Sequence, residues 1–141
     1  MSDTFNLQRF VDAQRAVYPR VLEELRSGHK TTHWIWFIFP QMAGLGHSET
    51  ARHYAISGAA EAQDYLLHPI LGPRLEECCT ALANHRTTPI AEILGHPDDL
   101  KLRSCLTLFA AIAPEHPLFK PLLNVFFGAD ADSRTLVLLG E

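Results

Sequence analysis

The chain has 141 residues, of which 47% are hydrophobic and 20% are charged, and its formal net charge is −4. These values are typical of globular proteins and exclude a largely disordered chain, while the acidic balance excludes an unspecific nucleic-acid binder. A chain of this length can build one core, and no linker-like stretch divides it. We therefore expect a single globular domain over residues 1–141.

The longest apolar run, residues 34–40, is much shorter than the roughly 20 residues that span a membrane, so we expect no membrane association. The polar N-terminus lacks the basic and apolar regions of a signal peptide. Three cysteines, two of them adjacent (Cys78, Cys79 and Cys105), make a poor disulfide framework. They favour reduced thiols and a cytoplasmic location.

Apolar residues recur at helical spacing through the first part of the chain, from Leu7 to Leu25. Pro19 interrupts this series, and proline is tolerated in a first helical turn but not in a helix interior. The pattern therefore predicts two helices, at about residues 4–16 and 19–27. Gly28 is suited to ending the second.

Residues 32–39 are ambiguous, because their β-branched and aromatic side chains suit a buried strand but do not alternate with polar ones. A short buried helix ended by Pro40 fits the pattern equally well. A glycine-containing loop follows at residues 41–47. Ser48 is then a good N-cap for a helix that runs to about Ile56.

Three His-Pro pairs each precede an apolar periodic segment, as expected if proline occupies the first position of a helix. The fold class that we predict is all-α, built mostly of short helices. The alternative is an α+β fold with a very small sheet that contains residues 33–39. The remaining expected helices are at about 58–67, 69–84, 89–94, 97–113, 116–127 and 132–139, the last capped by Asp132 or Ser133.

The aromatic segment and the loop after it could form a ligand pocket. Trp34 and Trp36 offer flat faces on which a base could stack. Gly44 and Gly46 would let backbone amides approach a phosphate, with the positive end of the helix at Ser48 nearby. The structural alternative is a buried aromatic segment followed by a turn and a capped helix.

A second candidate lies at the start of the helix predicted from residue 97. Asp98, Lys101 and Ser104 are three residues apart, so a carboxylate and an anion-binding lysine could lie near one substrate. The structural alternative is a surface ion pair in a first helical turn. The eight histidines show no zinc-type spacing, and we expect no metal site and no cofactor.

Two unusual strings resemble a small bacterial and fungal family catalogued as a domain of unknown function, and the resemblance extends over essentially the whole chain. Tyr54 is among its further matches, whereas Cys105 stands where the family more often has serine. The strings are His33-Trp34-x-Trp36-Phe37-x-Phe39-Pro40-Gln41-x-x-Gly44-Leu45-Gly46-x-Ser48 and Asp98-Asp99-Leu100-Lys101-x-x-Ser104-x-x-Thr107-Leu108-Phe109.

That family looks similar in fold to the YbiA-like proteins, also called the NADAR group, which are mostly helical N-glycosidases or ADP-ribose-related hydrolases. The resemblance implies a YbiA-like fold and a nucleotide-derived substrate. We therefore expect a hydrolase that cleaves an N-glycosidic bond in a nucleotide-like or ADP-ribose-like small molecule. The alternatives are a non-catalytic nucleotide- or anion-binding module and a structural interaction domain. The sequence does not determine the oligomeric state.

The two candidate segments together supply the residues that we expect in this site. Cleavage of an N-glycosidic bond builds positive charge on the ribose, and a carboxylate would stabilise that charge or activate water. Asp99 or, as second choice, Asp98 is the predicted carboxylate, with Lys101 as phosphate ligand, within reach of the loop from Gly44 to Ser48. The predicted substrate-binding residues are His33, Trp34, Trp36, Gln41, Gly44, Gly46, Ser48, Tyr54 and Ser104.

Overall fold

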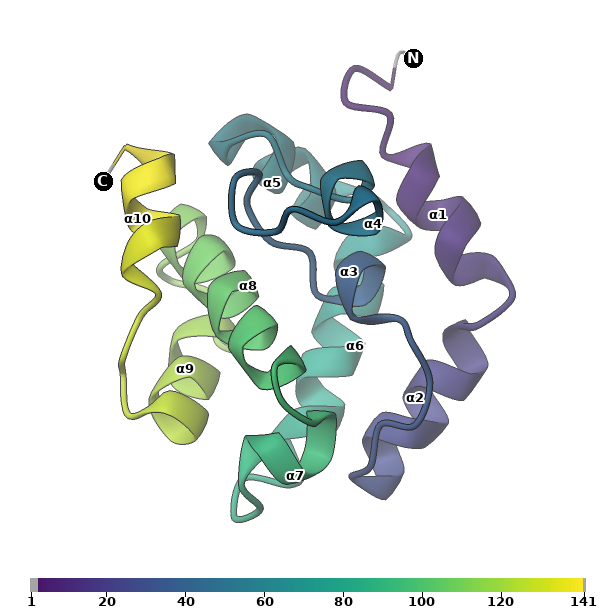
Figure 1. Cartoon of the computed structure of the whole chain (residues 1–141), viewed down its shortest axis with the longest axis vertical. Helices are drawn as coiled ribbons and strands as arrows, with labels where there is room; N and C mark the ends of the chain where they lie inside the picture. The colour runs from purple at the N-terminus through teal and green to yellow at the C-terminus, as the bar shows by residue number, and fades with distance from the viewer. Residues whose placement is uncertain (1–2, 141) are drawn as a thin grey trace.

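The computed structural model describes residues 3–140, and within them the chain forms helices and no strand (Figure 1). The all-α prediction is therefore confirmed. A single isolated parallel bridge joins Met42 to Ile56. The helices are α1 (Gln8–Arg15), α2 (Tyr18–Ser27), α3 (Ile35–Ile38), α4 (Glu49–His53), α5 (Ala59–Leu67), α6 (Leu71–Ala83), α7 (Ile90–Leu94), α8 (Asp98–Ile112), α9 (Phe119–Phe127) and α10 (Ser133–Leu139).

The ambiguous aromatic segment is the single helical turn α3, so the alternative with a small sheet at residues 33–39 is wrong. Ile35 and Ile38 are buried, and the amide of Phe39 donates to the carbonyl of Ile35. With no second strand beside it, this segment satisfies its backbone groups locally, as buried backbone must. The turn ends before Pro40, as the helical reading predicted.

The prediction that proline occupies the first position of three helices is wrong, because each proline lies before the first helical residue. At α6 the histidine of the pair performs the capping. His68 Nδ1 accepts hydrogen bonds from the amides of Ile70 and Leu71, at 3.1 and 3.2 Å. His116 accepts in the same way before α9. The imidazole thus satisfies donors that a helix start leaves free.

Two predicted helix ends are confirmed. Gly28 closes α2 in the left-handed conformation, with φ of +76°, where a side chain would be strained. Asp132, rather than Ser133, caps α10 by accepting a hydrogen bond from the amide of Thr135 at 3.2 Å.

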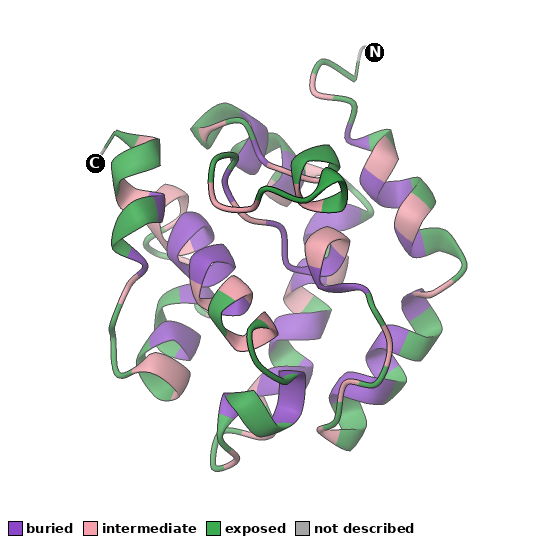
Figure 2. Cartoon of the chain, viewed as in Figure 1, coloured by how far each residue is buried: buried purple, intermediate pink, exposed green. Residues whose placement is uncertain are grey.

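Helix α8 runs through the middle of the molecule and contacts α3, α5, α7, α9 and α10 (Figure 1). Figure 2 shows that buried residues line its inner turns and the facing sides of its neighbours. Within this core the three cysteines are buried and free. In the part of the chain that the structure describes, no helix is both long enough and apolar enough to cross a bilayer.

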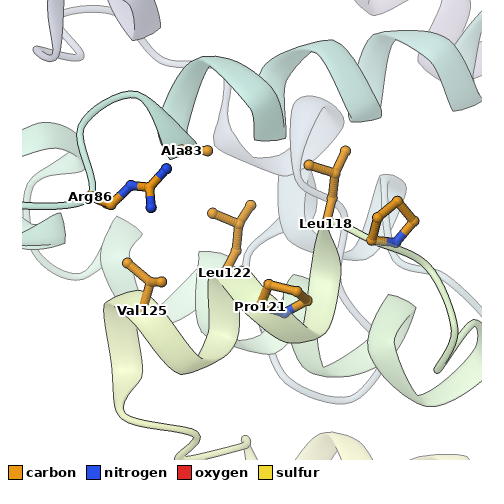
Figure 3. A pocket seen from close by; sticks show the side chains of 7 residues that line it. Ala83, Arg86, Leu118, Pro121, Leu122 and Val125 are labelled. Atoms are coloured by element: carbon orange, nitrogen blue, oxygen red, sulfur yellow. The ribbon is translucent and has the colours of Figure 1, made fainter.

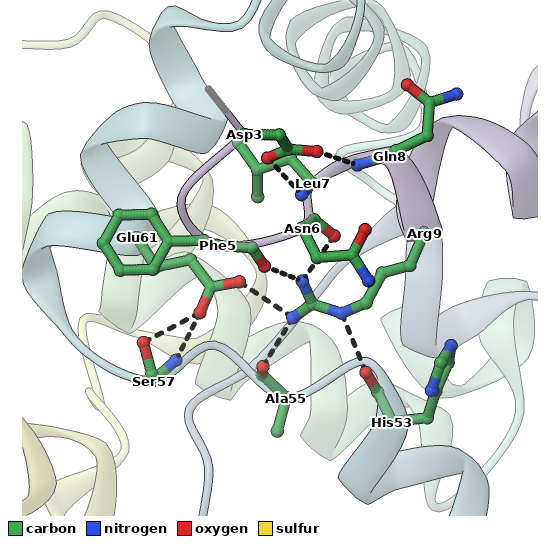
Figure 4. Close-up of polar contacts among 10 residues, drawn as sticks. All are labelled: Asp3, Phe5, Asn6, Leu7, Gln8, Arg9, His53, Ala55, Ser57 and Glu61. Carbon is green, nitrogen blue, oxygen red and sulfur yellow. Dashed lines mark hydrogen bonds and ion pairs between the residues drawn. The ribbon is translucent and has the colours of Figure 1, made fainter. Parts of the chain in front are cut away.

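The first helix is held by a nearly buried arginine, Arg9, whose side chain is 11% exposed (Figure 4). Its guanidinium donates to Glu61 Oε2 at 2.8 Å and to the backbone carbonyls of His53 and Ala55, at 2.8 and 2.9 Å. Glu61 also accepts from the amide and hydroxyl of Ser57. This network fixes the segment between α4 and α5 against α1.

Candidate functional site

Trp34 is a core residue, with 1% of its surface exposed. Its indole Nε1 donates to Glu24 Oε1 at 2.9 Å, and this carboxylate also accepts from the Thr32 hydroxyl and the Thr31 amide. Burial raises the pKa of Glu24, but these hydrogen bonds outweigh it and hold the pKa well below its usual range. Trp34 therefore anchors the aromatic segment, and its ring is not open to a ligand.

Trp36 is half-buried and lies where the two candidate segments meet. The Lys101 ammonium is 5.0 Å from the centroid of its ring. Asp98 Oδ1 is 3.3 Å from Lys101 Nζ, and Asp98 Oδ2 is 2.8 Å from Lys30 Nζ. Lys30 is itself nearly buried and stacks over Trp34 at 5.1 Å. We call Lys30, Trp34, Trp36, Asp98 and Lys101 the tryptophan–lysine cluster.

A cavity of about 420 Å³ opens beside this cluster, between α3 and α4. Phe37 and Tyr54 form an aromatic wall, with ring centroids 5.4 Å apart. Three of the predicted substrate-binding residues, His33, Trp36 and Tyr54, line this cavity together. The full lining is His33, Trp36, Phe37, Glu49, Thr50, His53 and Tyr54.

The glycines of the loop have structural partners. Gly44 has φ of +100°, and a Cβ there would lie 3.2 Å from Leu138 of α10. A Cβ on Gly46 would lie 2.5 Å from that of Ala51, so only glycine fits this approach to α4. Ser48 accepts from the Ala51 amide at 3.1 Å and is the predicted N-cap. The loop thus packs on α4 and α10, and the two candidate segments meet at Trp36 instead.

The remaining predicted residues lie apart from the cavity lining. The Asp99 carboxylate faces His96, with Oδ1 2.9 Å from Nδ1. Ser104 is buried and donates to Asp132 Oδ2 at 3.0 Å, which anchors the start of α10. The backbone carbonyl of Gln41 accepts from the Ile56 amide at 2.9 Å. The geometry thus gives Ser104 a structural contact that its sequence spacing did not indicate.

Several lining residues were not identified from the sequence. Phe37 belongs to the aromatic run and Glu49 to the predicted helix after Ser48, but neither is among the predicted binding residues. The position of His53, four residues after Glu49, would have placed both on one face of a helix, which was an available signal. The sequence gives no sign that Lys30 is nearly buried, because lysines in loops are usually solvated.

Nucleophilic chemistry at sulfur is disfavoured in this fold. Burial raises the pKa of Cys78 to about 12 and raises those of Cys79 and Cys105 well above the usual value. Such thiols stay protonated and unreactive at neutral pH. Among residues 3–140, no group of three or more His, Cys, Asp or Glu side chains could hold a metal ion.

One solved structure matches almost the entire chain, the conserved hypothetical protein Rv1873 from Mycobacterium tuberculosis. The sequences are 50% identical, the match covers 99% of both chains, and the TM-score is 0.96. Among curated proteins, no relative matches. The model of the family described as protein of unknown function DUF1810 matches residues 4–139, and this agrees with the resemblance to an uncharacterised family. The chain belongs to this family, DUF1810.

Proposed function

We propose that the cavity between α3 and α4 binds a small nucleotide-like, phosphate-containing molecule and that the protein hydrolyses its N-glycosidic bond. One observation carries the proposal: the Lys101 ammonium lies 5.0 Å from the centroid of Trp36, and Trp36 lines the cavity. Through Trp36, the cavity is connected to a cation, Lys101, and to the carboxylate that pairs with it, Asp98. The resemblance to YbiA-like hydrolases that we drew from the sequence motifs supports the substrate class by analogy only.

The chemistry of the lining suits a base with a charged group attached. The rings of Trp36, Phe37 and Tyr54 provide apolar faces for stacking. The imidazoles of His33 and His53 provide hydrogen-bonding nitrogens on the same cavity. Lys101 is 27% exposed, so its ammonium can turn from Trp36 to a phosphate.

For the hydrolytic step, the contacts favour Asp98 over Asp99 as the carboxylate. Asp98 holds the nearly buried Lys30 at 2.8 Å and the more exposed Lys101 at 3.3 Å. When Lys101 binds the phosphate, Asp98 Oδ1 is released while Oδ2 stays on Lys30, which keeps the carboxylate oriented. Its negative charge then stabilises the positive charge that develops on the ribose.

The step itself is a hydrolysis. Water adds to the anomeric carbon and loses a proton. The bond from that carbon to the base nitrogen breaks, and the base departs with the electron pair and takes up a proton.

The test measures binding and turnover separately. ADP-ribose, NAD and mononucleotides are screened by thermal shift, and release of the free base is followed by chromatography. We expect a ligand at 100 times its dissociation constant to stabilise the fold by about 2.7 kcal/mol. Asp98→Asn should abolish base release but retain binding, whereas Asp99→Asn, the matched control, should retain both.

Each outcome of this test discriminates between the candidate functions. Binding without base release would support the non-catalytic nucleotide-binding module. The absence of any shift across the panel would contradict the ligand class. Loss of turnover in Asp99→Asn alone would show that Asp99, and not Asp98, is the carboxylate that acts in the hydrolysis.

We further propose a cytoplasmic location, which the three free and buried thiols support.

A further inference from the structure

A second cavity lies on another part of the molecule, between the end of α6 and the length of α9 (Figure 3). Its volume is about 200 Å³. It shares no lining residue with the cavity between α3 and α4. The lining consists of Ala83, Arg86, Pro117, Leu118, Pro121, Leu122 and Val125.

Every lining side chain except one is apolar. A water molecule inside a protein needs two to four polar partners, and among the lining side chains only that of Arg86 is polar. The cavity is therefore poorly suited to ordered water and well suited to an apolar group, whose burial is favourable. Val125, which is 47% exposed, shows that part of this apolar wall faces solvent.

Arg86 differs from most other arginines of the chain. Five of the other arginines pair with a carboxylate: Arg9, Arg15, Arg20, Arg26 and Arg103. No carboxylate of residues 3–140 pairs with Arg86. Figure 3 shows its side chain extending from the turn after α6 toward the space between Ala83 and Leu122. An unpaired guanidinium at the edge of an apolar cavity is complementary to a carboxylate attached to an apolar body.

We propose that this cavity binds small monocarboxylates with an aromatic or branched apolar body, and that Arg86 pairs with their carboxylate. An apolar cavity of about 150 Å³ is known to accept benzene, so about 200 Å³ admits a body of that size. The body lies against Leu118, Leu122 and Val125. The carboxylate lies at the exposed rim, where the planar guanidinium can donate two parallel hydrogen bonds.

The experiment titrates the full chain with benzoate and with uncharged benzyl alcohol, and follows backbone amides by NMR. We expect saturable shifts at Ala83, Leu118, Leu122 and Val125, with benzoate binding at least tenfold more tightly than benzyl alcohol. Arg86→Gln should weaken benzoate binding about tenfold or more and leave benzyl alcohol unchanged. The matched control is Arg52→Gln, an exposed arginine outside this lining, which should bind benzoate like the original protein.

A second variant tests the location independently of Arg86. Val125→Glu places a negative charge on the wall, where it can pair with Arg86 and repel a carboxylate, so benzoate binding should be lost. Val125 is half exposed, and circular dichroism should show an intact fold. Equal affinity for benzoate and benzyl alcohol would overturn the proposal. It would also be overturned by equal benzoate binding in Arg86→Gln and Arg52→Gln, or by shifts confined to other regions.

Discussion

The Lys101 ammonium lies over the ring of Trp36, 5.0 Å from its centroid, and this contact joins the start of α8 to α3 at the edge of the candidate cavity. Cations favour such positions because the face of an aromatic ring carries partial negative charge. The interaction is modest at a partly exposed site. The lysine is therefore held in place in the free protein while remaining able to engage an anion.

Lys101→Ala should weaken binding of a phosphate-containing ligand by about 1.5–3 kcal/mol, the range for hydrogen bonds to charged groups. The fold should lose only about 0.5–1 kcal/mol, as for an exposed cation–π contact. Titration calorimetry with ADP-ribose and thermal unfolding measure the two effects. Lys120→Ala, on the exposed side of α9, is the control, and equal weakening in both variants would contradict the role of Lys101.

The ion pair between Arg9 and Glu61 should contribute far more to the free energy of unfolding than the exposed pair of Asp12 and Arg15 on the same helix. Removing one partner of a buried pair leaves an uncompensated charge and typically costs 3–5 kcal/mol. We expect about 3 kcal/mol for Glu61→Ala, because four backbone carbonyls remain around Arg9.

The internal control for this comparison is Asp12→Ala. Asp12 pairs with Arg15 at 3.1 Å, but both side chains are more than half exposed, so the loss should be below about 1 kcal/mol. Urea denaturation of both variants gives the free energies of unfolding. Similar losses in the two variants would show that burial does not strengthen the Arg9 network.

Glu24 should make the fold sensitive to acid. The pKa of Glu24 is lowered in the folded chain, so the unfolded chain takes up a proton first as the pH falls. The stabilisation is therefore complete well above the ordinary pKa of 4.5 and is lost as the pH falls below it toward the folded value.

Glu24→Gln should destabilise the protein at neutral pH by about 1–3 kcal/mol and flatten the acid limb of its stability curve. Glu23→Gln, which changes the exposed neighbour, should leave that limb unchanged. Unfolding free energies measured from pH 7 to pH 3 test both. An acid limb that is identical in Glu24→Gln and the original chain would contradict this assignment.

The buried thiols should affect the alkaline side of the same curve. In the unfolded chain a cysteine ionises near pH 9, whereas burial raises the pKa of Cys78 to about 12. The unfolded state therefore loses protons first, and stability should decline as the pH rises from 9 toward 12. A disulfide reagent at pH 8 should modify no thiol in the folded protein and three in denaturant, and rapid native labelling would contradict the burial of these residues.

Most of the helices could be predicted because their signals are local. Apolar periodicity placed α2, α5 and α10, and the ends at Gly28 and Asp132 follow from side-chain chemistry within a few residues. The starts of α6 and α9 were misplaced because a capping imidazole depends on the geometry of a turn. Neither the spacing of apolar residues nor the composition of the segment reveals the geometry of that turn.

The candidate site was less accessible to sequence reasoning because its contacts join distant segments. Ser104 has the spacing of a site residue, yet its hydroxyl binds Asp132, which lies far along the chain. Trp34 and Trp36 belong to the same aromatic run, but only Trp34 is buried, and its indole donates a hydrogen bond to Glu24. Only folding decides which member of each such pair faces a cavity.

Helix α10 has one buried residue within the described chain, Thr135, and is attached by polar contacts together with partly buried apolar side chains such as Leu139. Asp132 fastens its first turn to α8, and Arg134 donates to the Gly44 carbonyl at 3.1 Å. Elements held in this way open at a lower free energy than a packed core. Transient detachment of α10 would free the loop that leads into α4, and hydrogen exchange at residues 43–48 should then follow that of α10. The free energy of detaching α10 would therefore determine how often α4, which forms one wall of the candidate cavity, becomes mobile.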